Sequence, residues 1–361
     1  MKLKFKLKTK LHSIYKQIEI KEHKLSYLFL EITRKCNLNC LHCGSDCKAD
    51  SKFPELTTES WFKIIDYFEK TYSKSVAFII TGGEPLLHPD VFKIGKYISD
   101  KKMRWGMVTN GIKLNSSTLH KLIESGIYSI TLSLDGLENS HNWLRNSKIA
   151  YKKVLIALNE IGKSNIYFKD VVTCVNPKNI NELDKLAELL IRNKIENWRL
   201  FRIFPSGRAK NNDKLNLSFK QTQEMLDFIA KNKKAYFKKG LNLNLSCEGW
   251  ISMEKDIQVR DNPFFCRAGI NIASILSDGT ITGCTNNSEA FHVGNIIKDN
   301  FANLWENNFD IFRDRDWLKN TECINCKYFN QCKGSSIHLW ENFEDEKPKF
   351  CYAVDLEKLK S

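Results

Sequence analysis

The feature that most constrains the fold of this 361-residue chain is a regular alternation of strand-like and helix-like segments. Short runs rich in apolar and β-branched residues predict six strands, at 27–33, 76–81, 103–109, 129–134, 168–175 and 198–204. Parallel strands need long crossover connections, so the alternation predicts an α/β fold with a parallel sheet. Six units are too few for a closed eight-stranded barrel. We expect a partial (β/α)6 TIM-like barrel, and the pattern is also compatible with a flat doubly wound sheet.

The helices between these strands are marked by apolar stripes at helical spacing. The first stripe contains Trp61, Ile64, Ile65 and Phe68, with Thr57 or Thr58 available as the N-cap residue. Three further stripes are expected over 119–123, stopped by Gly126, over 154–161, ending at Gly162, and over 183–191.

Polar and glycine-rich turns follow several of the predicted strands. They are Thr81–Pro85, Thr109–Gly111 and Ser133–Gly136, and a cysteine-containing loop follows the first strand. Parallel α/β folds gather their active sites at the carboxyl ends of the strands, so these turns predict one shared site. Gly82 and Gly83 would let a ligand approach the backbone, and Glu84 offers a carboxylate to a cationic amine. Each turn alone would also fit an ordinary tight turn.

The loop after the first strand carries Cys36, Cys40 and Cys43 in a C-x3-C-x2-C run. Three thiolates on one loop are suited to a four-iron, four-sulfur cluster whose remaining iron stays open to a non-protein ligand. A structural zinc ion normally takes four protein ligands, so the zinc alternative would require Cys47 to join the set.

The composition favours an intracellular protein with metal or redox sites. There are twelve cysteines, no apolar run of transmembrane length and no signal-peptide pattern at the N-terminus, so we expect a cytoplasmic location. The net charge of +14 is spread along the chain, as on a solvated surface, and we expect no nucleic-acid partner. The N-terminus predicts a basic amphipathic helix that either docks on the rest of the chain or meets an acidic partner or anionic membrane. Its lysines are Lys2, Lys4, Lys6, Lys8, Lys10 and Lys16, beside Leu7, Leu11, Ile14 and Ile18.

Taken together, Cys36–Cys43 and Gly82–Pro85 resemble the motifs of the radical S-adenosylmethionine superfamily, over about Tyr27 to Arg208. The resemblance implies a [4Fe–4S] cluster on the three cysteines, S-adenosylmethionine chelated to its open iron, and a reductant such as flavodoxin or ferredoxin. It also implies contacts to S-adenosylmethionine: Gly82, Gly83 and Glu84 with the methionyl amine, Ser133 near the ribose or carboxylate, His42 beside the adenine, and Arg145 with the carboxylate.

The C-terminal third holds seven more cysteines, at 247, 266, 284, 323, 326, 332 and 351. A C-x2-C pair alone is also typical of zinc ribbons. The full spacing, with Gly279 between Cys266 and Cys284, resembles the SPASM extension of radical enzymes that modify peptides and proteins, which carries auxiliary iron–sulfur clusters. The resemblance implies that one auxiliary cluster is held by Cys323, Cys326, Cys332 and Cys351.

The resemblance fails at one position, where Ser336 stands in place of a cysteine. The missing ligand would normally serve a second auxiliary cluster, together with Cys266 and Cys284. Cys247 is a candidate replacement, and the alternatives are an empty site, a water-ligated cluster or a smaller cluster. We therefore expect one or two auxiliary clusters. No role is predicted for Cys47, and Cys174 is expected to be a small buried hydrophobic residue.

These patterns predict four parts: a basic N-terminal extension (1–24), a radical S-adenosylmethionine core (25–210), a helical connector (211–246) and a small cysteine-rich SPASM-type domain (247–361). The expected function is reductive cleavage of S-adenosylmethionine to a 5′-deoxyadenosyl radical that abstracts hydrogen from a peptide or small protein. The short stretch before Cys36 leaves no room for a separate leader-peptide-binding domain, which counts against a ribosomal peptide. The alternatives are a small cofactor or sugar precursor as substrate, and a non-catalytic iron–sulfur or zinc protein that binds a partner or senses redox state.

Overall fold

The computed structural model describes residues 2–354, with side chains from Leu7 onward. The chain forms two compact units. The core unit contains Phe29–Ser246 and Leu276–Gly279. The cysteine-rich unit contains, in its described part, residues 2–28, 247–275 and 280–354.

The core unit is built on seven strands that lie side by side in the order in which they occur in the chain. They are β1 (Tyr27–Thr33), β2 (Ala77–Gly82), β3 (Arg104–Thr109), β4 (Ser129–Ser133), β5 (Phe168–Val175), β6 (Asn197–Arg202) and β7 (Asn242–Leu245). The pairs from β2·β3 through β6·β7 are all parallel. A doubly wound sheet reverses its strand order at a switch point, whereas this order never reverses. The structure therefore has the strand order of an open barrel.

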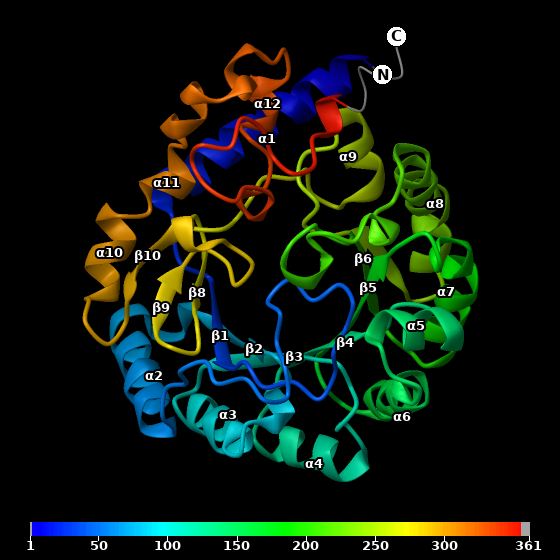
Figure 1. Cartoon of the computed structure of the whole chain (residues 1–361), viewed down its shortest axis with the longest axis vertical. Helices are drawn as coiled ribbons and strands as arrows, with labels where there is room; N and C mark the ends of the chain where they lie inside the picture. The colour runs from blue at the N-terminus through cyan, green and yellow to red at the C-terminus, as the bar shows by residue number, and fades with distance from the viewer. Residues whose placement is uncertain (1, 355–361) are drawn as a thin grey trace. The chain divides into compact units, whose positions relative to one another are not determined.

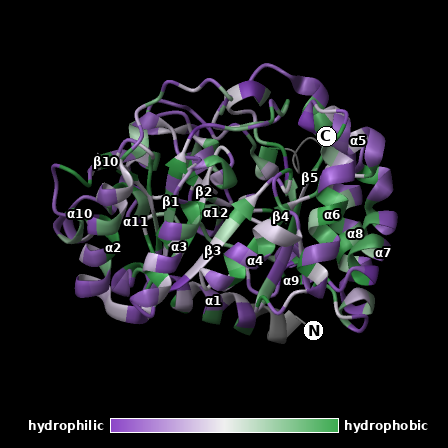
Figure 2. Cartoon of the chain, turned by 90° about the horizontal axis from the view of Figure 1, so that it is seen from below, coloured by the Kyte–Doolittle hydropathy of each residue, from purple (hydrophilic) through white to green (hydrophobic). Residues whose placement is uncertain are grey.

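The crossover helices of the core unit lie on the outside of these strands (Figure 1). They are α2 (Thr58–Tyr72), α3 (Val91–Asp100), α4 (Ser116–Glu124), α5 (Glu138–Arg145), α6 (Ala150–Lys163), α7 (Leu183–Arg192) and α8 (Phe219–Phe237). Helices α4 and α6 carry both hydrophilic and hydrophobic residues along their length (Figure 2), as amphipathic surface helices do. The apolar stripe predicted in α2 is buried, at Trp61, Ile64, Ile65 and Phe68.

Several predicted helix boundaries can be compared with the structure. The side chain of Thr57 caps α2 by accepting a hydrogen bond from the Ser60 amide, and α4 ends just before Gly126, which has a φ of +80°. The prediction that Gly162 ends its helix was wrong, because α6 continues to Lys163. A Cβ atom on Gly162 would lie 1.9 Å from the Asn193 carbonyl oxygen, so this glycine allows close packing inside a helix.

Within its described residues, the cysteine-rich unit contains one long α-helix, four short ones and three antiparallel strands. The helices are α1 (Lys2–Glu22), α9 (Met253–Val259), α10 (Phe301–Asn307), α11 (Asp310–Arg313) and α12 (Phe329–Cys332). The strands β8 (Ile272–Ile275), β9 (Thr280–Thr282) and β10 (His292–Asn295) pair in this order. Much of the remaining backbone is irregular. Aromatic side chains form much of the core of the cysteine-rich unit, including Trp305, Phe309, Phe312 and Trp340.

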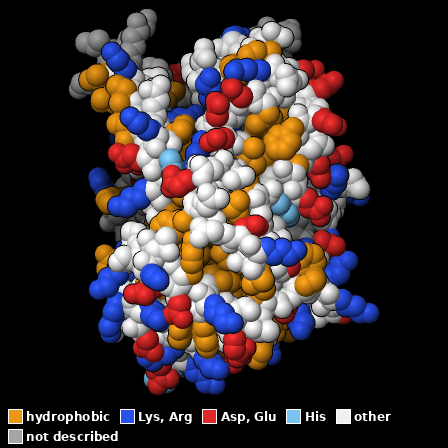
Figure 3. All heavy atoms as spheres, turned by 90° about the vertical axis from the view of Figure 1, so that its left-hand side faces the viewer, with side chains coloured by type: hydrophobic (Ala, Val, Ile, Leu, Met, Phe, Trp, Pro, Cys, Tyr) orange, Lys and Arg blue, Asp and Glu red, His pale blue; other side chains and the backbone are white. Residues whose placement is uncertain are grey.

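Helix α1 corresponds to the predicted basic helix. Leu7, Leu11, Ile14 and Ile18 are exposed, and the side chains of Lys2, Lys4 and Lys6 lie outside the described residues. Positive and negative side chains are interspersed on the face of the molecule seen in Figure 3. Among the described residues, no helix is both long enough and apolar enough to cross a membrane.

Candidate functional site

The three cysteines of the first motif lie on the loop between β1 and α2 (Figure 1). Cys36 and Cys40 are buried, Cys43 is half-buried, and the nearby Cys47 is also buried. The Cys36 amide donates a hydrogen bond to the Lys48 carbonyl over 3.1 Å, which closes the loop on itself. The fold thus holds the three thiols of the predicted set within one compact loop.

Arg208 fixes this loop from the segment that follows β6. Its Nε donates to the Cys40 carbonyl oxygen at 2.7 Å, and its Nη1 donates to the Cys47 carbonyl oxygen at 3.0 Å and to the Asp46 carboxylate at 2.8 Å. The preceding Gly207 has a φ of +53°, and a Cβ there would lie 2.4 Å from the Cys43 carbonyl oxygen. The sequence gives no sign that Arg208 contacts this loop, because 168 residues separate Arg208 from Cys40 and it belongs to no local motif.

Two side chains from other segments of the core unit donate hydrogen bonds to the cysteine sulfurs. Asn110, in the turn after β3, places its Nδ2 at 3.8 Å from the Cys36 Sγ. Arg145, at the end of α5, places its Nη1 at 3.7 Å from the Cys40 Sγ. Donors directed at sulfur stabilise thiolates and tune the potentials of iron–sulfur clusters, so these contacts suit a cluster on this loop.

The thiols of the loop differ in acidity. A hydrogen bond with Cys47 lowers the pKa of Cys43 to about 5, although burial opposes this shift. Burial raises the pKa of Cys36 to about 11, and the neighbouring Cys40 adds to the rise. The hydrogen bond with Cys47 thus favours the thiolate form of Cys43, whereas burial favours the protonated form of Cys36 until a metal binds.

The glycine pair after β2 serves a close contact between backbones. The Gly83 amide donates to the Thr33 carbonyl at 2.8 Å, and the Glu84 amide donates to the Lys35 carbonyl at 2.9 Å. A Cβ on Gly83 would lie 2.3 Å from the Lys35 oxygen, and one on Gly82 would lie 2.2 Å from the Thr33 oxygen. These glycines hold the turn against the start of the cysteine loop.

Glu84 is fully buried and connects this turn to the next one. Its carboxylate accepts hydrogen bonds from the Leu86 amide at 3.2 Å, the Thr109 hydroxyl at 2.8 Å and the Asn110 amide at 2.7 Å. Burial raises its pKa, and these three donors oppose the rise. A carboxylate has about four acceptor positions, so the three internal bonds leave room for one further donor.

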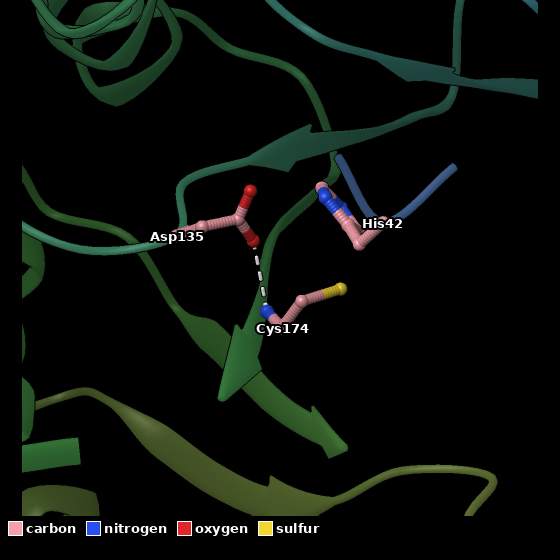
Figure 4. A group of neighbouring side chains, drawn as sticks. All are labelled: His42, Asp135 and Cys174. Carbon is pink, nitrogen blue, oxygen red and sulfur yellow. Dashed lines mark hydrogen bonds between the residues drawn. The ribbon is translucent and has the colours of Figure 1, made fainter. Parts of the chain in front are cut away.

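Arg145 and Asp135 form a buried ion pair behind Cys40, with Nε and Oδ2 2.6 Å apart. The other carboxylate oxygen of Asp135 accepts from the Cys174 amide at 2.8 Å. The His42 ring lies beside this pair, so that ligand atoms of His42, Asp135 and Cys174 are all within 4.8 Å of one another (Figure 4). Burial lowers the pKa of His42 to about 4, which keeps the ring neutral. Because Arg145 already supplies the positive charge at Asp135, the group does not need a metal ion.

The residues around the loop suit a bound cofactor. Within the part of the chain that the structure describes, the buried Asn37 Nδ2 and His42 Nδ1 have no hydrogen-bond partner, and both belong to the cysteine loop. Such orphaned polar atoms are uncommon in folded proteins unless a ligand completes their hydrogen bonds. Ser133, another predicted contact, is buried at the end of β4.

In the cysteine-rich unit, four predicted ligands line a single cavity of about 340 Å³. They are Cys323, Cys326, Cys332 and Cys351, with the rings of Trp250, Phe329, Phe350 and Tyr352 around them. Burial raises the pKa of Cys332 to about 12, and Cys351 and Cys323 add to the rise because their charges lie close by. The fold thus brings residues 28 positions apart, from Cys323 to Cys351, to one site.

The other three cysteines meet at the position where the resemblance fails. Cys247 is exposed as a residue, but the atoms packed around its sulfur desolvate the thiol and raise its pKa, and the charges of Cys266 and Cys284 add to the rise. The Cys247 sulfur lies 3.8 Å from the hydroxyl of Ser336, a fully buried residue. The Trp250 amide donates to the Ser335 hydroxyl at 2.9 Å, which ties the segment of Cys247 to that of Ser336.

Comparison with known proteins agrees with this arrangement. The family profile of the radical SAM superfamily matches residues 30–190, and that of the SPASM iron–sulfur cluster-binding domain matches residues 266–327. An AdoMet-dependent heme synthase of Methanosarcina barkeri is 27% identical over 89% of this chain and 95% of its own length. Mycofactocin maturase MftC of Mycolicibacterium smegmatis is 26% identical over 85% of this chain and 76% of its own length.

Solved structures show the same fold. SuiB of Streptococcus suis superposes with a TM-score of 0.70 at 16% identity, covering 92% of this chain and 79% of its own. The structure of anSMEcpe with bound AdoMet gives a TM-score of 0.69 at 19% identity, covering 92% and 95%. The cofactors of this family are a [4Fe–4S] cluster with S-adenosylmethionine, and auxiliary iron–sulfur clusters in the C-terminal domain. The radical SAM match contains the three cysteines of the first loop, the SPASM match contains Cys266, Cys284, Cys323 and Cys326, and the chain is therefore a radical SAM enzyme with a C-terminal SPASM domain.

Proposed function

We propose that this radical SAM enzyme modifies a peptide or small protein. The observation that carries the proposal is the set of four cysteines around one cavity in the C-terminal unit, in addition to the cysteine loop of the core. A peptide substrate is supported by the relative named as a mycofactocin maturase and by the fold likeness to SuiB, of which one structure contains the precursor peptide SuiA. Flavodoxin or ferredoxin is the proposed reductant.

In the proposed site, Cys36, Cys40 and Cys43 would hold the [4Fe–4S] cluster. With one electron from the reductant, the bound cluster would cleave S-adenosylmethionine to methionine and a 5′-deoxyadenosyl radical, which would abstract hydrogen from the substrate. Asn110 and Arg145 donate hydrogen bonds to the sulfurs of Cys36 and Cys40, which would stabilise these thiolates once they bind the cluster.

The remaining contacts would orient S-adenosylmethionine. Glu84 accepts one hydrogen bond from the methionyl ammonium at its remaining acceptor position, beside the backbone of Gly82 and Gly83. Ser133, His42 and Arg145 remain the proposed neighbours of the ribose, the adenine and the carboxylate. For His42, the support is its unpartnered Nδ1 atom, which an adenine or ribose group would satisfy.

In the C-terminal unit, Cys323, Cys326, Cys332 and Cys351 are the proposed ligands of one auxiliary cluster. Cys247, Cys266 and Cys284 are the proposed ligands of a second, with Ser336 at the place of the fourth. The contact between Cys247 and Ser336 supports recruitment of Cys247, and the nearby Asn287 Nδ2, buried without a partner among the described residues, is available to a cluster sulfur.

A small-molecule substrate is the second candidate, and a specific observation favours it. The heme synthase relative matches nearly its whole length at 27% identity, which is as similar as the maturase. A tetrapyrrole substrate would make this chain a biosynthetic enzyme with the same radical chemistry.

The test is an anaerobic assay of reconstituted protein with a strong reductant. Wild-type protein should convert S-adenosylmethionine to 5′-deoxyadenosine, and the triple variant Cys36→Ala, Cys40→Ala, Cys43→Ala should not. The variant should retain iron in the C-terminal unit, which shows that it is folded. Unchanged cleavage by the triple variant would reject the assignment.

The substrate is tested in the same assay by mass spectrometry. Peptides encoded by short reading frames beside the gene are offered in one arm and iron porphyrin precursors in another. A mass change in a peptide that depends on S-adenosylmethionine supports the proposal. Turnover of the porphyrin with unmodified peptides would replace it with the second candidate.

A further inference from the structure

A second cavity in the cysteine-rich unit joins the N-terminal helix to both auxiliary sites. It has a volume of about 170 Å³, and α1 contributes Lys16 to its wall. The opposite wall includes Cys266 and Cys332, one cysteine from each of the two proposed ligand sets. A lysine of the N-terminal helix therefore lines the same cavity as one cysteine from each of the two proposed auxiliary sites.

The wall of this cavity carries more positive than negative charge. Its cations are Lys16, Arg313, Arg315 and Lys333, and among its described residues Asp314 is the one carboxylate. Buried cations are unfavourable unless anions compensate them. Iron–sulfur clusters with thiolate ligands carry negative charge, so clusters at the two sites would add negative charge beside these cations.

The electrostatics of Lys16 agree with this interpretation. Burial lowers its pKa to about 8, and the Arg315 cation lowers it further. Negative charge on Cys332 and on Cys266 acts in the opposite direction. The Arg315 guanidinium is held in position by the hydrogen bonds that it donates to the carbonyl oxygens of Lys333 at 2.8 Å and Ser335 at 2.7 Å.

Residues of α1 before and after Lys16 make contacts that anchor the helix. The Glu19 carboxylate accepts from Arg267 Nη1 at 2.7 Å and from Asn271 Nδ2 at 2.8 Å. The rings of His12 and Tyr15 lie against Phe265, with centroids 5.9 and 6.1 Å apart, and the Trp305 indole donates to the His23 carbonyl at 2.9 Å. The helix is thus anchored on both sides of Lys16.

We propose that Lys16 is a charge-compensating residue of the auxiliary iron–sulfur centre, whose ammonium group stabilises the negative charge of the clusters at both sites. This inference rests on the ligand sets proposed above. Reduction adds one negative charge to a cluster, so a nearby fixed cation stabilises the reduced state more than the oxidised state. Lys16 therefore raises the reduction potentials of the auxiliary clusters, and the N-terminal helix is part of their redox environment.

The test is a potentiometric titration at pH 7, followed by electron paramagnetic resonance. It uses full-length protein with the Cys36→Ala, Cys40→Ala and Cys43→Ala substitutions, so that the auxiliary clusters alone contribute signals. Lys16→Met removes the charge, Lys16→Arg keeps it, and Lys10→Met removes an exposed charge from the same helix as a matched control. Iron and sulfide are quantified in every sample.

Lys16→Met should shift at least one auxiliary potential to a more negative value. We expect about a tenfold change in the reduction equilibrium, which is about 59 mV for a one-electron couple. Lys16→Arg and Lys10→Met should leave the potentials near those of the parent protein. Loss of iron from Lys16→Met with retention in Lys16→Arg would also support the charge role.

Three results would overturn the inference. Full iron content with unchanged potentials in Lys16→Met would reject the role of Lys16 and leave the proposed ligand sets standing. Equal loss of iron from Lys16→Met and Lys16→Arg would show that the shape of the side chain matters and its charge does not. If the parent protein holds no auxiliary cluster, the ligand sets are wrong and the inference fails with them.

Discussion

At the scale of single residues, the cysteine loop depends on charged groups that do not contact S-adenosylmethionine in any predicted role. Asp135 is one of them. It is fully buried, pairs with Arg145 at 2.6 Å, and so holds the guanidinium whose Nη1 reaches the Cys40 sulfur. Burial alone would raise the pKa of Asp135, but Arg145 and the nearby histidines outweigh it and lower that pKa below its usual value.

The ion pair predicts a dependence of stability on pH. Because the pKa of Asp135 is lower in the folded than in the unfolded state, its stabilisation is complete above the unfolded value of about 3.9 and is lost as the pH falls below it. Asp135→Asn leaves Arg145 buried without its partner, which should cost about 3–5 kcal/mol of unfolding free energy near neutral pH.

The measurement is urea unfolding of the cluster-free protein between pH 3 and 7. The difference between wild type and Asp135→Asn should stay constant above about pH 5 and shrink at lower pH. Glu138→Gln, an exposed change on helix α5, which also carries Arg145, should alter the free energy by less than about 0.5 kcal/mol. A pH-independent difference would contradict the role of the ion pair.

Ser336 gives a second prediction at this scale. If it stands at the position of a missing ligand, Ser336→Cys should raise iron content or stabilise a labile cluster, and Cys247→Ala should lower iron content. Three four-iron clusters correspond to about twelve iron atoms and two to about eight, so iron and sulfide analysis distinguishes them. A wild-type protein with the full complement that Cys247→Ala leaves unchanged would mean that another group ligates the site.

At the scale of elements, the turn after β2 fixes the cysteine loop by direct backbone contact. Gly83→Ala should therefore displace the loop, because the new Cβ would lie 2.3 Å from the Lys35 carbonyl. We expect several-fold lower retention of the loop cluster and a parallel loss of S-adenosylmethionine cleavage. Gly44→Ala is the matched control within the loop itself, since the nearest atom to its new Cβ is 4.0 Å away.

The two variants are compared by iron retention and 5′-deoxyadenosine yield after anaerobic reconstitution. Equal behaviour of Gly83→Ala and Gly44→Ala would show that the close contact is not needed. The sequence predicts that these glycines admit a ligand, and the structure adds that they also bring the turn into contact with the backbone of the cysteine loop.

The elements themselves were largely predictable, and the exceptions have physical reasons. Strands β1 and β5 lie at the predicted residues, because long apolar and β-branched runs are buried on both faces. Strand β7 was missed, since Asn242–Leu245 has four residues, half of them polar, inside a lysine-rich stretch. Of the site, sequence motifs indicate the cysteines and the turns that contain Asn110 and Asp135. The contact of Arg208 with the loop, and the hydrogen bonds from Asn110 and Arg145 to the sulfurs, arise only when distant segments fold together.

At the scale of the whole molecule, the proposed radical and auxiliary sites belong to different compact units. Replacing Cys323 and Cys326 with alanine should therefore leave S-adenosylmethionine binding nearly unchanged while it abolishes or strongly lowers substrate turnover. Equilibrium binding of S-adenosylmethionine and product formation are measured on the same preparation. An equal loss of both would show that the auxiliary ligands support the whole fold instead.

The composition of the cysteine-rich unit also bears on how the protein is made. That unit combines the first helix of the chain with segments from its final third, whereas the core unit is almost entirely the continuous stretch Phe29–Ser246. Domains generally fold as units, the N-terminal ones first, while synthesis proceeds. During synthesis, the core unit can therefore fold, with its cysteine loop, before the C-terminal segments are translated. Helix α1 can pack in its own unit only after those last segments have been made.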